Sequence, residues 1–191
     1  MDKELLKVCE KCGLSKSRNN VVIPKGEIDS DVMFIGEAPG KNEDKEGLPF
    51  VGRAGKWFDE IISILGIQNY YVTNTVKCNP KDINNRNRPP SDYEMKMCSD
   101  WLRDEIKEIK PKIGVLMGGT ALKAFFPDTK LKNVVGEEVL GHSITDNLGT
   151  RLFVLYHPAV LIYNEKYFKP LYKEHLNGLK RLITEETGGS V

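Results

Sequence analysis

Four short, largely apolar runs along the chain have the length of buried β-strands. Each contains four or five residues, and none shows the strict alternation of apolar and polar positions that marks a strand with one face in water. The runs cover residues 32–35, 70–73, 113–117 and 152–156. Continuous apolar strands of this kind are typical of a parallel sheet whose two faces are both covered.

Apolar residues spaced three or four positions apart lie between and after these runs, and they predict helices. The periodic stretches cover residues 57–65, 95–109, 121–126 and 168–183. Ser91 and Glu94 have the spacing of a capping box before the second stretch, and Pro111 would stop that helix. Strands that alternate with helices predict an α/β fold, here a three-layer α/β/α sandwich with a central four-stranded parallel sheet.

The length and composition fit one globular domain over residues 1–191, because 40% of the residues are hydrophobic and 29% are charged. No apolar run approaches the roughly 20 residues that a membrane-spanning helix needs. Residues 1–4 carry charges of both signs and no apolar stretch, so we expect a cytoplasmic protein without a secretory signal. Residues 187–191 have the composition of a frayed tail.

The charge balance gives no overall attraction to polyanions, since 28 Lys and Arg residues stand against 27 Asp and Glu residues. Any binding to nucleic acid therefore depends on local patches. Two stretches, residues 77–90 and 165–181, are locally basic. Charged stretches are often only solvated surface, but two that flank one site suit a phosphate backbone.

The residues that follow the predicted strands are chemically distinctive. Glu37 follows the first strand, Asn74 the second, a glycine pair the third and His157 the fourth. Because ligands bind outside the carboxyl ends of the strands in open parallel sheets, these groups are expected to share one rim. Taken singly, Asn74 could cap a turn and His157 could be a structural histidine, so the interpretation depends on their convergence.

Four cysteines suggest a metal site rather than disulfides, because thiols stay reduced inside cells. Cys9 and Cys12 form a CxxC pair, whose thiolates can reach one metal from a single tight turn. Cys78 and Cys98 are more widely spaced, and Cys98 also fits the apolar face of a helix as an ordinary core thiol. The spacing by itself does not choose between zinc and an iron–sulfur cluster.

The glycine-rich stretch that starts at Gly36 is not a phosphate-binding loop of the Walker type. Three residues separate Gly36 from Gly40, where that motif needs four, and Asn42 stands where Ser or Thr is required. The sequence therefore argues against an enzyme that hydrolyses nucleoside triphosphates.

Several motifs together resemble the family 4, iron–sulfur uracil-DNA glycosylases of bacterial and archaeal thermophiles. They run in the expected order: Cys9-x-x-Cys12, Gly36-Glu-Ala-Pro-Gly40, Glu43-Asp44, Gly47-x-Pro-Phe-Val-Gly52, Tyr71-Val-Thr-Asn74-x-Val-Lys-Cys78, Asn87-Arg-x-Pro89, Cys98 and Tyr156-His-Pro-Ala159. The chain departs from the pattern after the histidine, where some members carry an Arg and this sequence reads Val160-Leu-Ile-Tyr163.

The resemblance implies a monofunctional enzyme that hydrolyses the N-glycosidic bond of uracil in DNA and leaves an abasic site for base-excision repair. It also implies a structural [4Fe–4S] cluster held by Cys9, Cys12, Cys78 and Cys98, with residues 1–20 and 78–98 contributing the cluster site. The expected partner is uracil-containing DNA, single- or double-stranded. We expect a monomer that is cytoplasmic and associated with the nucleoid.

The same resemblance assigns roles around the base. Phe50 would stack on a flipped uracil, the Asn74 amide would read its N3–H and O4, and His157 would donate to O2, where charge gathers as uracil leaves. Glu43 is expected near C5, where it would exclude the methyl group of thymine. Related glycosylases have an Asp at the position of Ala38, so a water-activating carboxylate is missing there.

The expected catalytic residues are therefore His157, Glu37 and Asn74, with Glu37 positioning the water. Glu37, Ala38, Glu43, Phe50, Asn74 and His157 form the expected uracil pocket. The expected DNA contacts are Arg86 and Arg88 on the phosphate backbone and Ala159, Val160 and Leu161 in the duplex, within a wedge segment that runs from Ala159 to Ile162. Two other functions stay open: a glycosylase of the same superfamily with broader specificity for deaminated bases, and a non-catalytic, metal-dependent module that binds nucleic acid.

Overall fold

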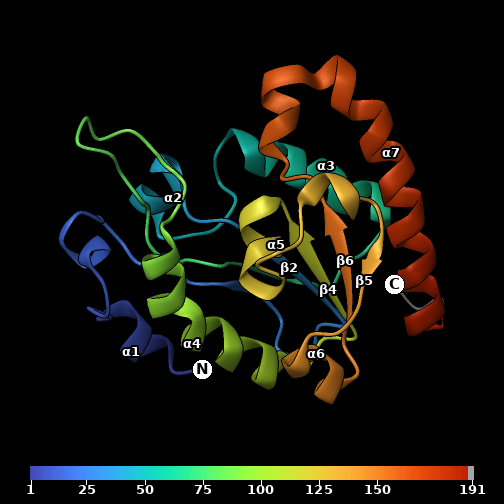
Figure 1. The fold of residues 1–191 in the computed structure, drawn as a ribbon, viewed down its shortest axis with the longest axis horizontal. Helices are drawn as coiled ribbons and strands as arrows, with labels where there is room; N and C mark the ends of the chain where they lie inside the picture. The colour runs from blue at the N-terminus through green and yellow to red at the C-terminus, as the bar shows by residue number, and fades with distance from the viewer. Residues whose placement is uncertain (189–191) are drawn as a thin grey trace.

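The four predicted strands form the centre of the β-sheet in the computed structural model, which describes residues 1–188 (Figure 1). Strands β2 (Val32–Gly36), β3 (Tyr71–Asn74), β4 (Ile113–Met117) and β6 (Arg151–Leu155) lie parallel in the order β3-β2-β4-β6. Residues 189–191 of the predicted tail lie outside the described part. The prediction of a central four-stranded parallel sheet is thereby confirmed.

Two edge strands make the whole sheet mixed and six-stranded, which the sequence analysis did not predict. Strand β1 (Lys25–Gly26) pairs antiparallel with β3, and β5 (Glu138–Val139) pairs antiparallel with β6. Each edge strand has two residues, too few to show any periodicity.

The four predicted helices are present, with shifted bounds. They are α3 (Arg53–Leu65), α4 (Asp92–Ile109), α5 (Gly119–Phe125) and α7 (Ala159–Thr187). Ser91 caps α4 through the predicted capping box, since its hydroxyl accepts from the Glu94 N–H and the Glu94 carboxylate accepts from the Ser91 N–H. Helix α7 starts earlier than its apolar stripe, and non-helical backbone at Asn164 separates its first turn from the rest.

Shorter elements connect these helices and strands. They are α1 (Lys3–Lys7), α2 (Lys41–Glu46), α6 (Ser143–Leu148) and the 3-10 turns Gly13–Lys16 and Leu131–Asn133. Among residues 1–188, no helix is both long enough and apolar enough to cross a membrane.

Two separate hydrophobic cores cover the two faces of the sheet, as expected for three layers. Helices α3 and α7 pack on the face that carries Phe34, Val115 and Leu155. Helices α4 and α5 pack on the opposite face, against Ile35 and Leu116 (Figure 1). Because both faces are buried, the strands read as continuous apolar runs.

The strand order places a crevice between β2 and β4. The chain leaves β2 for β3 on one side of it and later returns to β4 on the other side. At such a switch point the two outgoing connections diverge and leave space beyond the carboxyl ends of the strands. The end of β2 pairs with the end of β3 through Gly36 and Asn74, so the predicted rim is a real feature of the fold.

Candidate active site

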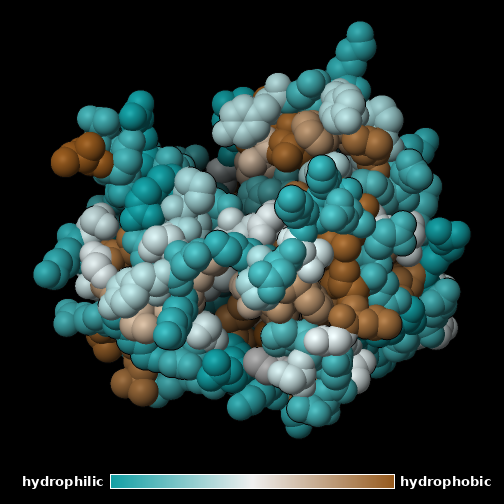
Figure 2. Space-filling view, in the orientation of Figure 1, coloured by the Kyte–Doolittle hydropathy of each residue, from teal (hydrophilic) through white to brown (hydrophobic). Residues whose placement is uncertain are grey.

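A cleft of about 550 Å³ lies over this rim. It is lined by the six residues expected to form a base pocket, Glu37, Ala38, Glu43, Phe50, Asn74 and His157. Parts of the 80–90 segment and the start of α7 form its outer walls. The outline of the molecule is notched between these two segments in the space-filling view (Figure 2). The fold therefore brings together groups from four parts of the sequence.

Phe50 is held in an unusual backbone conformation at the side of the cleft. Its φ is +55°, in the left-handed region that non-glycine residues rarely adopt. The carboxylate of Glu43 accepts hydrogen bonds from the next two backbone N–H groups, those of Val51 (3.1 Å) and Gly52 (2.8 Å). The Phe50 ring packs on Phe58 with a centroid distance of 4.7 Å. Glu43 and the core thus fix the phenyl ring in place.

Asn74 ends β3 with its side chain buried beside the same ring. A Cβ atom added at Gly36 would lie 2.4 Å from Asn74 Oδ1 and 2.9 Å from Phe50 Cζ. Both contacts are shorter than van der Waals distance, so only glycine fits at the end of β2. The missing side chain brings the amide edge and the phenyl ring close to one point, an arrangement suited to a flat ring with polar edges.

His157 faces the cleft as a neutral hydrogen-bond donor. Its Nδ1 accepts from the backbone N–H of Ala159 at 3.2 Å, which assigns the proton to Nε2. Burial lowers the pKa of His157 to about 4, so the ring is uncharged near neutral pH. Its plane lies within 25° of the Phe50 ring at a centroid distance of 6.0 Å.

A hydrogen bond across the switch point links Glu37, which follows β2, to the segment that follows β4. The hydroxyl of Thr120, on the first turn of α5, donates to the Glu37 carboxylate. Thr120 was missed by the sequence analysis because it belongs to no motif and becomes relevant only when β2 and β4 lie side by side. The bond fixes one carboxylate oxygen and leaves the other available at the cleft.

The five residues expected to contact DNA occupy different environments. Arg88 donates two bonds to the Glu94 carboxylate (2.8 and 2.6 Å), which lower the pKa of Glu94. Arg86 is exposed and pairs with Asp82. In α7, Leu161 is buried in the core and Val160 packs against it, whereas Ala159 lines the cleft. Leu161 therefore does not face the cleft.

The cleft wall at the start of α7 is completed by the last residue of the expected wedge segment and by the residue after it. Ile162 and Tyr163 both line the cleft, and Tyr163 is 85% exposed. Tyr163 immediately precedes the non-helical backbone at Asn164, which ends this first turn and has no sequence signature.

The four cysteines come together around one small cavity. All four line it, and none forms a disulfide. Three N–H groups point at sulfur: Trp101 Nε1 at Cys9 (3.3 Å), an Arg18 guanidinium nitrogen at Cys78 (3.5 Å) and the Lys77 amide at Cys98 (3.4 Å). Such donors stabilise sulfur ligands and tune the clusters they bind.

Burial raises the pKa of the Cys78 thiol to about 11 and that of Cys98 to about 12. Among residues 1–188, no three Cys, His, Asp or Glu side chains are arranged to hold a single metal ion. The cavity is instead lined by four cysteine sulfurs, three of which accept N–H hydrogen bonds. This ligand set suits a metal group that is bound by thiolates alone.

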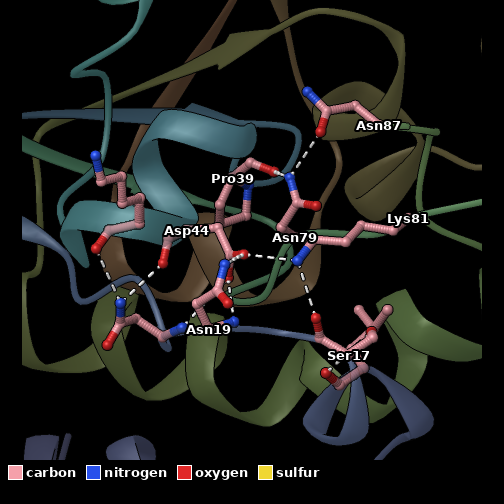
Figure 3. Close-up of polar contacts among 10 residues, drawn as sticks. Ser17, Asn19, Pro39, Asp44, Asn79, Lys81 and Asn87 are labelled. Atoms are coloured by element: carbon pink, nitrogen blue, oxygen red, sulfur yellow. Dashed lines mark hydrogen bonds and ion pairs between the residues drawn. The ribbon is translucent and has the colours of Figure 1, made fainter. Parts of the chain in front are cut away.

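A buried carboxylate joins the cysteine-bearing segments to the cleft (Figure 3). Asp44 of α2 accepts from the backbone and side-chain amides of Asn19 (2.9 and 2.6 Å) and from the Lys81 ammonium (2.8 Å). Lys81 also donates to the Ser17 carbonyl at 2.9 Å. Helix α2 carries Glu43, so this network ties the first 20 residues and the 78–98 segment to the loop that holds Phe50.

Comparison with known proteins places the chain in a family. A family model described as the uracil DNA glycosylase superfamily matches residues 23–179. The type-4 uracil-DNA glycosylase of Thermotoga maritima is 36% identical over 185 residues, which cover 96% of this chain and 88% of that protein. Those of Saccharolobus solfataricus and Sulfurisphaera tokodaii are 38% and 39% identical, over 93% and 85% of this chain and 83% and 74% of theirs.

The resemblance predicted from the motifs is thereby confirmed. The family match spans β2 to β6 and all residues of the cleft, and the similarity to type-4 enzymes extends over most of the sequence. The chain belongs to the uracil-DNA glycosylase superfamily and is a uracil-DNA glycosylase of type 4.

Proposed function

We propose that this single-domain enzyme is a monofunctional glycosylase that flips uracil out of DNA into the cleft and hydrolyses its N-glycosidic bond. The observation that carries the proposal is the convergence of a phenyl ring, a buried amide and a neutral imidazole N–H on one point of the cleft. A flipped base loses its stacking and pairing partners, at a cost of roughly a few kcal/mol, and these groups replace both.

Recognition of uracil is assigned to Phe50 and Asn74. Phe50 stacks on the base, and the Asn74 amide accepts from N3–H and donates to O4. Cytosine presents an acceptor at N3 and a donor at C4, so it would leave both amide atoms buried and unpaired. Glu43 is proposed to close the pocket near C5 against the thymine methyl group, and it also holds the Phe50 loop.

Catalysis is assigned to stabilisation of the leaving group. As the bond to deoxyribose breaks, negative charge gathers on uracil O2, and the Nε2–H of His157 donates to it. A neutral imidazole suits this task because it donates a hydrogen bond to O2 while its own proton stays on Nε2. Ala38 offers no carboxylate, so positioning of the attacking water is assigned to the adjacent Glu37, with Thr120 fixing its orientation.

The direct test of the reaction is release of uracil from a single-stranded oligonucleotide that carries one uracil. Matched oligonucleotides carry cytosine, thymine or hypoxanthine at the same position. We expect an abasic site from uracil alone. Release of hypoxanthine as well would favour the broader specificity, and DNA binding without any abasic product would favour a non-catalytic binding module.

Contact with DNA is assigned to both walls of the cleft. Arg86 is exposed and would meet the phosphate backbone, whereas Arg88 orients the segment through Glu94. Ala159, the partly buried Ile162 and the exposed Tyr163 form the wedge that fills the space left by the flipped base. The chain acts as a monomer, because one copy supplies every group of the proposed site.

Replacing Tyr163 with alanine tests the wedge. A wedge side chain offsets the unstacking of a duplex and has less to do in a single strand, so we expect kcat/KM to fall about tenfold on double-stranded DNA and about twofold on single-stranded DNA. Tyr167→Ala is the matched control, since Tyr167 is exposed on the same helix but does not line the cleft. Equal losses on both substrates would refute the wedge role.

The cysteines are proposed to hold a [4Fe–4S] cluster that links residues 1–20 to the 78–98 segment. Four thiolates, with N–H donors on three of the sulfurs, are the usual ligand set of such clusters. When bound, the cluster would cross-link the two segments and would take no part in the hydrolysis. The reacting groups all come from the cleft.

Replacing Cys98 with serine tests this site. We expect the purified protein to lose its brown colour and its iron, and its thermal midpoint to fall, because the buried segment loses a covalent anchor. The control is Ser99→Ala, one position along the same helix and partly exposed, with its hydroxyl bonded to the Lys96 carbonyl. Iron analysis and the visible spectrum are the measurements. A colourless wild-type protein with bound zinc would show that the ligand set holds another metal.

A further inference from the structure

Lys77 is a fully buried lysine between the uracil-reading end of β3 and the cysteine site. It is 1% exposed, and its ammonium makes three hydrogen bonds. The acceptors are the Asn74 carbonyl (2.7 Å), the Glu105 carboxylate (2.9 Å) and the Thr73 hydroxyl. A buried ammonium is rare unless fully paired, so its three bonds fix its position closely.

The counter-ion of Lys77 is equally buried. Glu105 has 0% exposure and projects from the middle of α4, the helix that also carries Cys98. The backbone N–H of Lys77 donates to Cys98 Sγ (3.4 Å). One residue therefore contacts the strand end that reads the base and the helix that carries a cluster ligand.

The turn that contains Lys77 is anchored to the rim on its other side too. Thr75 donates through its amide and its hydroxyl to the Gly36 carbonyl (both 2.9 Å), and Val76 donates to the Glu37 carbonyl (3.1 Å). The Lys77 ammonium holds the Asn74 carbonyl at the start of this turn (2.7 Å). The Asn74 amide is a short side chain, so a rotation of its backbone moves the amide directly.

We propose that Lys77 is a positioning residue: its bond to the Asn74 carbonyl fixes the Asn74 backbone and thereby aims the Asn74 amide at uracil, while Glu105 balances its charge. This inference rests on the role proposed for Asn74. Placement errors of about 1 Å can lower rates about 100-fold, so a rigid anchor on the carbonyl has direct value for recognition. Neither Lys77 nor Glu105 lines the cleft.

The test separates this role from simple stabilisation of the fold. Lys77→Met removes the ammonium and keeps most of the side-chain volume. The double variant Lys77→Met/Glu105→Leu removes both charges, and apolar pairs of similar volume often replace buried ion pairs without loss of stability. Both variants lack the bond to Asn74, but only the first leaves Glu105 unpaired.

The measurements are the thermal midpoint, the visible absorbance of the cluster, the rate of uracil release and the inhibition constant of free uracil. We expect the double variant to recover stability and absorbance, yet to bind free uracil about tenfold more weakly and to release uracil about 10- to 100-fold more slowly. Glu105→Gln, which keeps Lys77 beside Asn74, should bind free uracil as the wild type does.

Wild-type uracil affinity in the double variant would overturn the proposal and leave the pair a structural one. A poor yield of that variant does not remove the test, since Lys77→Met and Glu105→Gln weaken the same ion pair and only Lys77→Met breaks the Asn74 bond. Equal uracil affinities in these two would likewise overturn it. Asn74→Ala is measured in parallel: if it leaves uracil binding unchanged, the role of Asn74 fails, and not that of Lys77 alone.

Discussion

Replacing His157 with alanine is expected to lower kcat for uracil release by about 10²- to 10³-fold, about 3 to 4 kcal/mol, which is typical for loss of one oxyanion donor. The N–H of His157 is the group placed to meet charge on uracil O2, and its tautomer is fixed by the Ala159 amide. Replacing Glu37 with alanine should lower kcat by a smaller factor, because water can reach an open cleft without this carboxylate.

The comparison of His157→Ala with Glu37→Ala in single-turnover assays decides between two accounts. A larger loss for Glu37→Ala would contradict leaving-group stabilisation and favour activation of water. Phe50 packs beside His157, so the control Phe50→Leu, which keeps an apolar side chain, shows how much of the loss comes from stacking.

The pH profile provides a second check on His157. Burial lowers its pKa to about 4, below the value of about 6.5 in an unfolded chain. The folded enzyme therefore keeps the ring neutral from about pH 8 to about pH 5.5, and no activity step should trace to this residue in that range. As the pH falls from about 6.5 to about 4, the unfolded state takes up the proton first, and stability declines.

Replacing Asn74 with alanine is expected to lower kcat/KM for uracil by about 10²- to 10³-fold. Both hydrogen bonds to the base edge are lost, and the polar edge of uracil then enters a buried site unpaired. Free uracil should inhibit the variant more weakly by a similar factor, since the same contacts bind the product. Steady-state assays and inhibition by uracil provide the measurements.

A matched asparagine is available as a control for Asn74→Ala. Asn69 precedes the same strand at its other end, exposed and bonded to Ser30 and Asp29, so Asn69→Ala should leave uracil release unchanged. If Asn74→Ala retained wild-type activity on uracil, the edge-reading role would be refuted, and recognition would have to reside in backbone groups of the cleft.

Much of the fold was predictable because its elements carry local signals. The strands β2, β3, β4 and β6 are buried on both faces, so they appear as apolar runs. The capping box fixes the start of α4. The two-residue edge strands and helix α2 have no such pattern, because neighbouring segments rather than their own sequences hold them.

The candidate site, like the fold, was predictable only in part. Glu37, Asn74 and His157 lie at the ends of their strands or within two residues of them, so parallel pairing alone brings them to one rim. The sequence did not indicate the partners that orient them, such as Thr120 and Lys77, because these residues come from other turns or are buried by tertiary packing. Nor did it indicate that Leu161 faces the core, since the kink at Asn164 redirects the start of α7.

The sequence by itself determined the family, the order of strands and helices along the chain and the residue types of the pocket. These depend on motifs and on periodicity, which are local along the chain. The tertiary structure alone decided which groups meet across β2 and β4, the neutral state of His157 and the buried bond from Lys77 to Asn74. The first depends on contacts between distant segments and the other two depend on burial, so none of the three is written in any short stretch of sequence.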